Sequence, residues 1–163
     1  MKRLTTVFML AAVLMFTGNA LAKGESKVAK YGWGMNFQIP TGDKATAGIM
    51  KVLMPNLLVG LDLGFSWQDG DPDANWGMLL GPMMRYYVAG TGPVNLYIHG
   101  KLEFAKNKDV DAQLALFGGF GVEWFVTDQF SLAGDTGLGI QLMPSDNLAF
   151  ATFSHGLSAN LYW

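Results

Sequence analysis

Apolar and polar residues alternate along the last stretch of the chain, and this period of two restricts the folds open to it. Between Leu148 and Trp163, one parity carries Phe153, Leu157, Ala159, Leu161 and Trp163, and the other carries Ser154, Gly156, Ser158, Asn160 and Tyr162. Because successive side chains of a β-strand point to opposite faces, this pattern predicts a strand with one apolar and one polar face. The preceding stretch, Phe130 to Leu142, repeats the pattern.

Six further segments alternate in the same way, separated by short turn sequences. They cover residues 31–39, 47–54, 57–67, 76–88, 94–105 and 112–126. The second of these is the least clear, and we assign Met50, Val52 and Met54 to its apolar face and Lys51 to its polar face. No helical period appears between the segments, which argues against a parallel α/β fold. The chain is therefore predicted to be all-β, an eight-stranded antiparallel up-and-down barrel.

The N-terminal residues have the pattern of a secretory signal peptide. Lys2 and Arg3 precede an apolar run from Val7 to Phe16, and Ala20-Leu21-Ala22 provides small residues for cleavage. The run is shorter than the roughly 20 apolar residues that a membrane-spanning helix needs. We therefore expect residues 1–22 to be a signal peptide, residues 23–30 a short leader, and residues 31–163 the barrel.

The apolar face of this barrel is predicted to point outward, into lipid. Half of the residues are hydrophobic and only 15% are charged, and an interior enclosed by eight strands is too narrow for so many bulky side chains. Aromatic residues also gather near both ends of the strands, as in the girdles of transmembrane barrels. The predicted girdle residues are Tyr31, Trp33, Trp67, Trp76, Tyr86, Trp124, Phe130 and Phe150. The alternative is a soluble, lipocalin-like cup with the apolar face inside.

The polar parity places charged side chains in the predicted lumen. This set is Lys51, Asp62, Arg85, His99, Lys101, Glu103, Glu123 and Asp135. Three cations against four carboxylates are nearly balanced, and buried charges need partners. We expect a network of ion pairs and hydrogen bonds that fills the lumen; a polar channel is the alternative.

Residues Gly118 to Gly139, GGFGVEWFVTDQFSLAGDTGLG, resemble the opacity-type small outer-membrane β-barrel proteins, which are related in architecture to the membrane domain of outer membrane protein A. The final Leu161-Tyr162-Trp163 is similar to their C-terminal insertion signal. The resemblance implies a bacterial outer-membrane location and insertion by the barrel assembly machinery. It also implies contact with outer-membrane lipid and lipopolysaccharide, and termini on the periplasmic side. The short loops argue against adhesion through long loops.

No catalytic or cofactor site is predicted. Asp69, Asp71 and Asp73 have the spacing of a calcium loop but lack its glycine and its final glutamate. His155 and Ser158 fall on opposite faces, which does not suit the His/Ser pair of a lipid A deacylase. The net charge of −2 does not indicate nucleic-acid binding.

The expected function is that of a monomeric, non-enzymatic barrel with a structural role in the envelope. The alternatives are a narrow porin-like channel and, less favoured, a lipid A-modifying enzyme.

Overall fold

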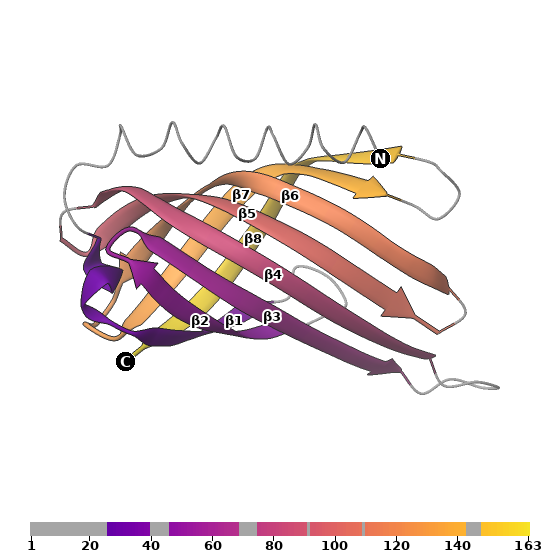
Figure 1. Ribbon diagram of the computed structural model, residues 1–163, viewed down its shortest axis with the longest axis horizontal. Coiled ribbons are helices and arrows are strands. Elements are labelled where there is room, and N and C mark those ends of the chain that lie inside the picture. The colour runs from indigo at the N-terminus through magenta and orange to yellow at the C-terminus, as the bar shows by residue number, and fades with distance from the viewer. Residues whose placement is uncertain (1–25, 40–45, 69–74, 91, 109, 143–147) are drawn as a thin grey trace.

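Eight antiparallel strands form a closed barrel in the computed structural model of the chain, which describes residues 26–39, 46–68, 75–90, 92–108, 110–142 and 148–163 (Figure 1). The strands are β1 (Trp33–Ile39), β2 (Thr46–Met54), β3 (Leu57–Gln68), β4 (Asn75–Gly90), β5 (Val94–Asn107), β6 (Val110–Phe125), β7 (Phe130–Leu142) and β8 (Leu148–Tyr162). The predicted all-β, eight-stranded up-and-down barrel is confirmed. The predicted signal peptide lies outside the described residues.

Each strand pairs with its neighbour in sequence, and β1 pairs with β8 to close the sheet. In that closing pair, Gly34 lies opposite Tyr162 and Ile39 opposite Leu157. Closure satisfies the backbone groups of both outermost strands, so these paired stretches leave no free sheet edge. No helix in this described part of the chain is long and apolar enough to cross a membrane.

A short 3₁₀ turn, η1 (Lys27–Lys30), precedes the first strand and lies at the end of the barrel that also holds the C-terminus (Figure 1). We call this end the terminus end and the opposite end the loop end. Tyr31 caps η1, so β1 begins at Trp33 instead of at the predicted Tyr31.

Side-chain direction alternates along each strand. In β1, Trp33, Met35, Phe37 and Ile39 are exposed, whereas Gly34 and Asn36 are buried. The predicted parity of β2 was wrong for most of the strand: Ile49 is exposed and Met50 is fully buried. Met54 is exposed as predicted, because the register shifts between Val52 and Met54. Both parities of β2 carry apolar side chains, so alternation alone could not separate its two faces.

Candidate functional site: outer wall and filled interior

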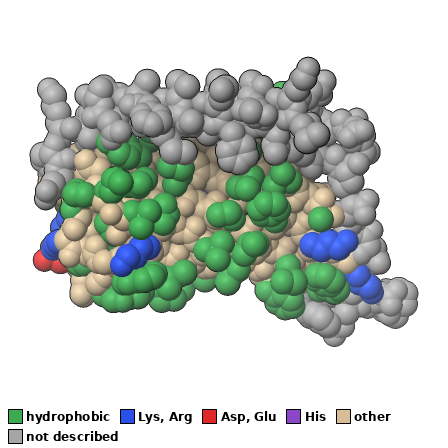
Figure 2. All heavy atoms as spheres, viewed as in Figure 1, with side chains coloured by type: hydrophobic (Ala, Val, Ile, Leu, Met, Phe, Trp, Pro, Cys, Tyr) green, Lys and Arg blue, Asp and Glu red, His purple; other side chains and the backbone are tan. Residues whose placement is uncertain are grey.

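The outside of the barrel is a wall of exposed apolar side chains. All eight strands contribute, with Met35, Ile49, Leu63, Met78, Leu96, Phe120, Leu138 and Leu157 among the exposed residues. Figure 2 shows hydrophobic side chains along the visible side of the barrel, with lysine and arginine side chains near its two ends. The wall therefore has an apolar middle.

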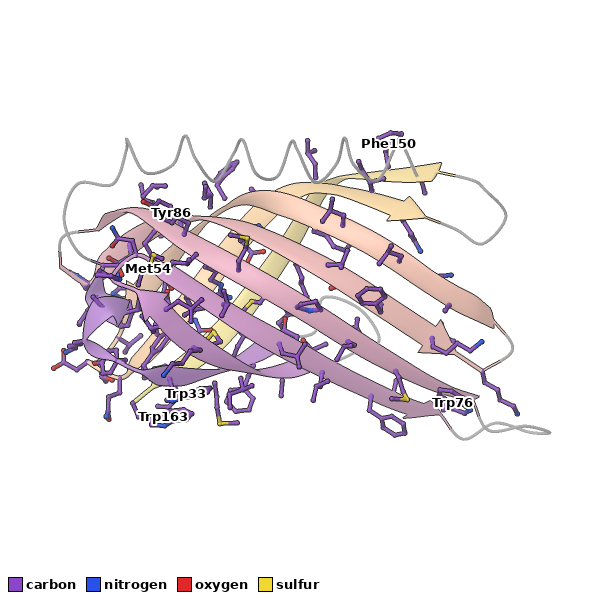
Figure 3. All side chains as sticks on the ribbon, in the orientation of Figure 1. Trp33, Met54, Trp76, Tyr86, Phe150 and Trp163 are labelled. Carbon is purple, nitrogen blue, oxygen red and sulfur yellow. The ribbon has the colours of Figure 1, made fainter. Side chains whose placement is uncertain are left out.

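Aromatic side chains on this wall lie toward both ends. Trp33, Tyr86 and Trp163 lie near the terminus end, and Trp76 and Phe150 lie near the loop end (Figure 3). Two other residues from the predicted girdles, Trp124 and Phe130, are exposed next to the turn at residues 127–129, at the terminus end.

Two aromatic residues at the terminus end do not lie on the wall, and the side-chain position of a third is not described. Tyr31 is not on the wall: its ring stacks on that of Tyr162, with centroids 5.7 Å apart. Tyr162, in the predicted insertion signal between exposed Leu161 and Trp163, is itself fully buried in the interior. The side chain of Trp67 lies outside the described residues.

Glu123, on β6, is the centre of the interior near the terminus end. Its carboxylate accepts hydrogen bonds from the Tyr87 hydroxyl at 2.5 Å, the Tyr162 hydroxyl at 2.8 Å and the Asn160 amide at 2.9 Å. The Ser131 hydroxyl also donates to it. Glu123 is fully buried, and several donors can hold a buried carboxylate because hydrogen bonds replace its lost hydration.

Arg85, on β4, joins this network through neutral side chains. It donates to Asn160 Oδ1 at 3.5 Å and to the Ser158 hydroxyl at 3.3 Å, and its guanidinium lies 5.0 Å from the centre of the Tyr97 ring. Although both side chains are described, no ion pair joins Arg85 to Glu123. Asn160 instead bridges them, accepting from the arginine and donating to the carboxylate.

A second network lies between β3 and β5. Lys101 Nζ lies 3.0 Å from Asp62 Oδ2 and 2.8 Å from Glu103 Oε1. Gln38 adds to it by donating to Asp62 at 3.3 Å and accepting from the Thr46 hydroxyl at 2.8 Å. One cation thus holds two carboxylates, and amide and hydroxyl groups complete the contacts.

Asp135 and His99 lie between the two networks. The Tyr97 hydroxyl donates to Asp135 at 3.2 Å, and the rings of Tyr97 and His99 meet edge to face at 6.2 Å. The structure therefore brings seven of the eight predicted lumen residues into the interior, in two main groups.

Lys51 is the exception. It follows the outward parity of β2, and its Nζ lies 4.4 Å from the centre of the exposed Trp33 ring. Without it, the described interior holds two permanent cations, Arg85 and Lys101, against four carboxylates. The expected near-balance of charge was wrong, and neutral hydroxyl and amide donors make up the difference around Glu123.

Glycines make room for the large interior side chains. Gly121 lies directly opposite Tyr97, and a Cβ on it would be 2.4 Å from the Tyr97 ring. A Cβ on Gly48 would be 2.2 Å from the carboxylate of Asp62. Pairing large with small residues on neighbouring strands is how a narrow barrel fills its interior.

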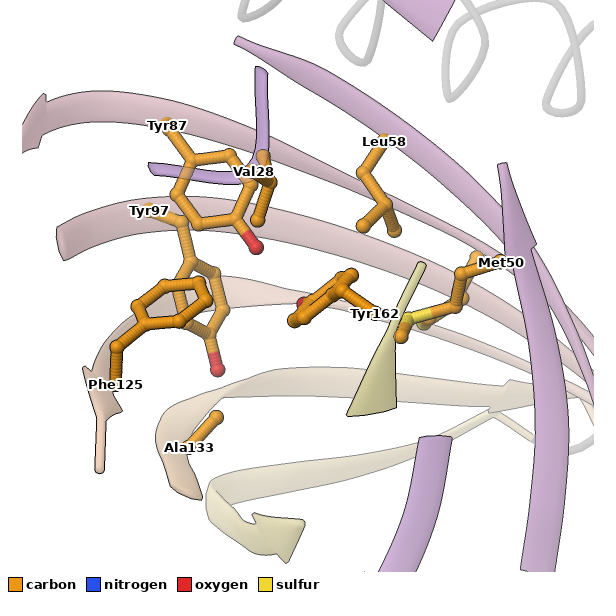
Figure 4. Close-up of a cluster of buried hydrophobic side chains, with 9 residues drawn as sticks. Val28, Met50, Leu58, Tyr87, Tyr97, Phe125, Ala133 and Tyr162 are labelled. Carbon is orange, nitrogen blue, oxygen red and sulfur yellow. The ribbon is translucent and has the colours of Figure 1, made fainter. Parts of the chain in front are cut away.

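The 3₁₀ turn η1 packs against the interior at the terminus end. Val28 is fully buried in an apolar cluster that includes Tyr87, Phe125 and Tyr162 (Figure 4). Ser26, just before η1, donates through its hydroxyl to the Pro55 carbonyl at 2.6 Å. The leader residues 26–30 are thus a plug, which the sequence did not predict.

An exposed ionic contact holds the plug to the turn between β6 and β7. Asp128 lies 3.2 Å from Lys27 Nζ and 3.5 Å from Lys30 Nζ. The Tyr31 hydroxyl also donates to the backbone carbonyl of Asp128. The hydrogen bond from Lys27 and the charge of Lys30 lower the pKa of Asp128 below its ordinary value.

Of the residues weighed as catalytic or metal-binding, Ser158 is buried in the interior, where it accepts from Arg85. Asp69, Asp71, Asp73 and the side chain of His155 lie outside the described residues. In the ranges that the structure covers, no group of three His, Asp or Glu side chains is arranged to hold a metal ion.

No protein-family model, curated protein or solved structure matches this chain.

Proposed function

We propose that the chain is a small outer-membrane β-barrel protein whose apolar wall faces lipid and whose filled interior gives it a structural, non-enzymatic role in the bacterial envelope. The observation that carries this proposal is the inversion of the usual burial pattern. Leu138 and Phe120 are more than 60% exposed, whereas Glu123, Asp62 and Asn160 are fully buried.

A lipid environment accounts for this inversion. An apolar surface that runs around all eight strands is far larger than the patches of a few hundred Å² found on soluble monomers. In a bilayer the closed barrel satisfies its backbone hydrogen bonds internally, and its apolar side chains meet hydrocarbon. The aromatic residues toward both ends match the two membrane interfaces.

The orientation and partners belong to the same proposal. The terminus end faces the periplasm, and the loop end meets lipopolysaccharide. The barrel acts as a monomer after export through a cleaved signal peptide and insertion by the barrel assembly machinery. The resemblance of Gly118–Gly139 to opacity-type barrels supports this assignment.

The filled interior supports a structural role over a channel. Fully buried Glu123, Tyr87 and Tyr162 occupy the interior near the terminus end, and Val28 is packed against them. In planar bilayers we expect silence or rare small openings; steady openings of hundreds of picosiemens would favour the channel.

An arginine substituted into the middle of the wall tests the lipid assignment. Leu138, opposite Gly118 in the middle of β6, is 62% exposed. Leu138→Arg should lower the free energy of unfolding from vesicles by about 2–4 kcal/mol, because a lipid-facing charge at mid-depth is costly. The readout is the urea midpoint of the heat-modifiable gel band.

The matched control is Val126→Arg, an exposed residue next to the turn at the terminus end. This substitution should lower the free energy of unfolding by only about 0–1 kcal/mol, as expected for a charge near a membrane interface. Equal small effects of the two arginines would show that Leu138 faces water, and would refute the proposal.

A further inference from the structure

Charged residues are nearly absent from the outward parity of the described strands. The exceptions are Lys51 near the terminus end of β2 and Lys106 near the loop end of β5. Lys51 is three residues from the end of its strand, about 10 Å along the chain at the usual rise. It therefore sits at the border of the apolar wall, within reach of a membrane interface.

Two indole rings and an unsubstituted glycine surround the ammonium of Lys51. Its ammonium lies over the Trp33 ring. Of the described atoms, a Cβ on Gly32 would meet only this ammonium, at 4.0 Å, so these atoms leave the space beside it open. The Trp163 carbonyl accepts from the backbone N–H groups of Gly32 and Trp33, which brings the second indole alongside the first (Figure 3). Both indoles are exposed, at 43% and 50%.

Among the residues that the structure describes, no carboxylate pairs with the ammonium of Lys51. Every ion pair found among the described residues joins other side chains. The Trp33 ring contacts only one side of the Lys51 ammonium, which has three hydrogen-bond donors. An unpaired cation at the edge of an apolar wall favours an anion that itself carries apolar chains.

We propose that Gly32, Trp33, Lys51 and Trp163 bind the phosphate of an anionic phospholipid in the leaflet at the terminus end. Lys51 contacts the phosphate, which lies in the space beside Gly32, and the two indoles pack against the glycerol and the first methylenes. This inference depends on the proposed membrane location. A phospholipid fits better than a protein partner because the site is continuous with the apolar wall on the strand side.

Native mass spectrometry in zwitterionic micelles titrated with phosphatidylglycerol tests the site. The wild-type barrel should retain one phosphatidylglycerol molecule more tightly than phosphatidylcholine. Lys51→Gln should weaken that retention about fivefold, as expected for one lysine near an anionic lipid surface. Lys106→Gln, at the other end of the wall, should leave it unchanged.

Gly32→Leu is a second variant that keeps the lysine but fills the space beside it; it should also weaken retention. Equal retention by wild type, Lys51→Gln and Gly32→Leu would overturn the site while leaving the lipid-facing wall intact. Displacement by millimolar inorganic phosphate would show a free-anion site and also overturn it. If Leu138→Arg lowers the free energy of unfolding no more than Val126→Arg does, the proposed membrane location is refuted, and the lipid site, which depends on it, is refuted as well.

Discussion

At the scale of single residues, Glu123 shows how a barrel interior can hold a carboxylate that forms no ion pair with any described cation. Two tyrosine hydroxyls, one serine hydroxyl and one amide donate to it. Hydrogen bonds to a charged group contribute more than those between neutral groups, about 1.5–3 kcal/mol each. The same carboxylate thereby fixes side chains from β4, β7 and β8.

Removing this acceptor should destabilise the barrel strongly. Glu123→Ala leaves buried donors unpaired and should cost about 3 kcal/mol or more, whereas Glu123→Gln keeps one acceptor oxygen and should cost about 1 kcal/mol. The free energy of unfolding in micelles, measured by urea titration, gives both values. Val122→Ala, the next residue on the outer wall, is the control, and a Glu123→Ala effect no larger than this control would argue against the network.

Parity in the sequence was enough to place Glu123 and Arg85 inside, because their strands alternate clearly. It failed for Lys51, whose neighbours on both parities are apolar. It also could not reveal the partners of Glu123, since cross-strand register decides which side chains meet and the sequence does not state the register. Tyr162 was assigned both to the polar parity and to the insertion signal, and only the structure shows that its hydroxyl reaches Glu123.

At the scale of elements, the strands were predictable and the plug was not. Each long strand repeats the alternation of apolar and polar residues several times, so the sequence pattern is sufficient to predict it. The turn η1 has only four residues and therefore no period to detect. Its place in the fold depends on one buried side chain, Val28, and on contacts with segments distant in sequence.

The ionic contact of the plug predicts a pH dependence. The pKa of Asp128 is lowered from its ordinary value of 3.8 by Lys27 and Lys30, so its ionised form favours the docked plug. This contribution is present above pH 3.8 and is lost as the pH falls below that value and through the lowered pKa. The amide of Tyr31, bonded to the Val28 carbonyl at 2.9 Å, should then lose protection from hydrogen exchange.

Asp128→Asn is the matched variant for this measurement. It should show reduced protection of the Tyr31 amide at neutral pH and no further acid-dependent loss from this contact. Protection that follows the same acid profile in both proteins would mean that the docking of η1 does not depend on this carboxylate.

At the scale of the whole molecule, closure connects the two ends of the chain. The Trp163 N–H donates to the Trp33 carbonyl at 3.0 Å, and the Trp163 carbonyl accepts from Gly32 at 3.1 Å and Trp33 at 3.0 Å. Strand number and alternation in the sequence predicted a barrel, but not which terminal residues seal it. The last three residues therefore have a structural role in addition to the recognition role that the resemblance implies.

These two roles can be separated by truncation. Deleting Leu161, Tyr162 and Trp163 removes the closing backbone bonds at Gly32 and Trp33 and a donor to Glu123, and it leaves only the pairs from Asn36–Asn160 to Ile39–Leu157 between β1 and β8. The shortened chain should therefore fail to give a heat-modifiable form even when refolded in micelles without assembly factors. Trp163→Phe keeps the backbone bonds and should refold as the wild type does. If the truncated chain refolds normally in micelles but is lost from the outer membrane of cells, the tripeptide serves recognition alone. Closure at Trp33 and Trp163 would then contribute little to the stability of the barrel.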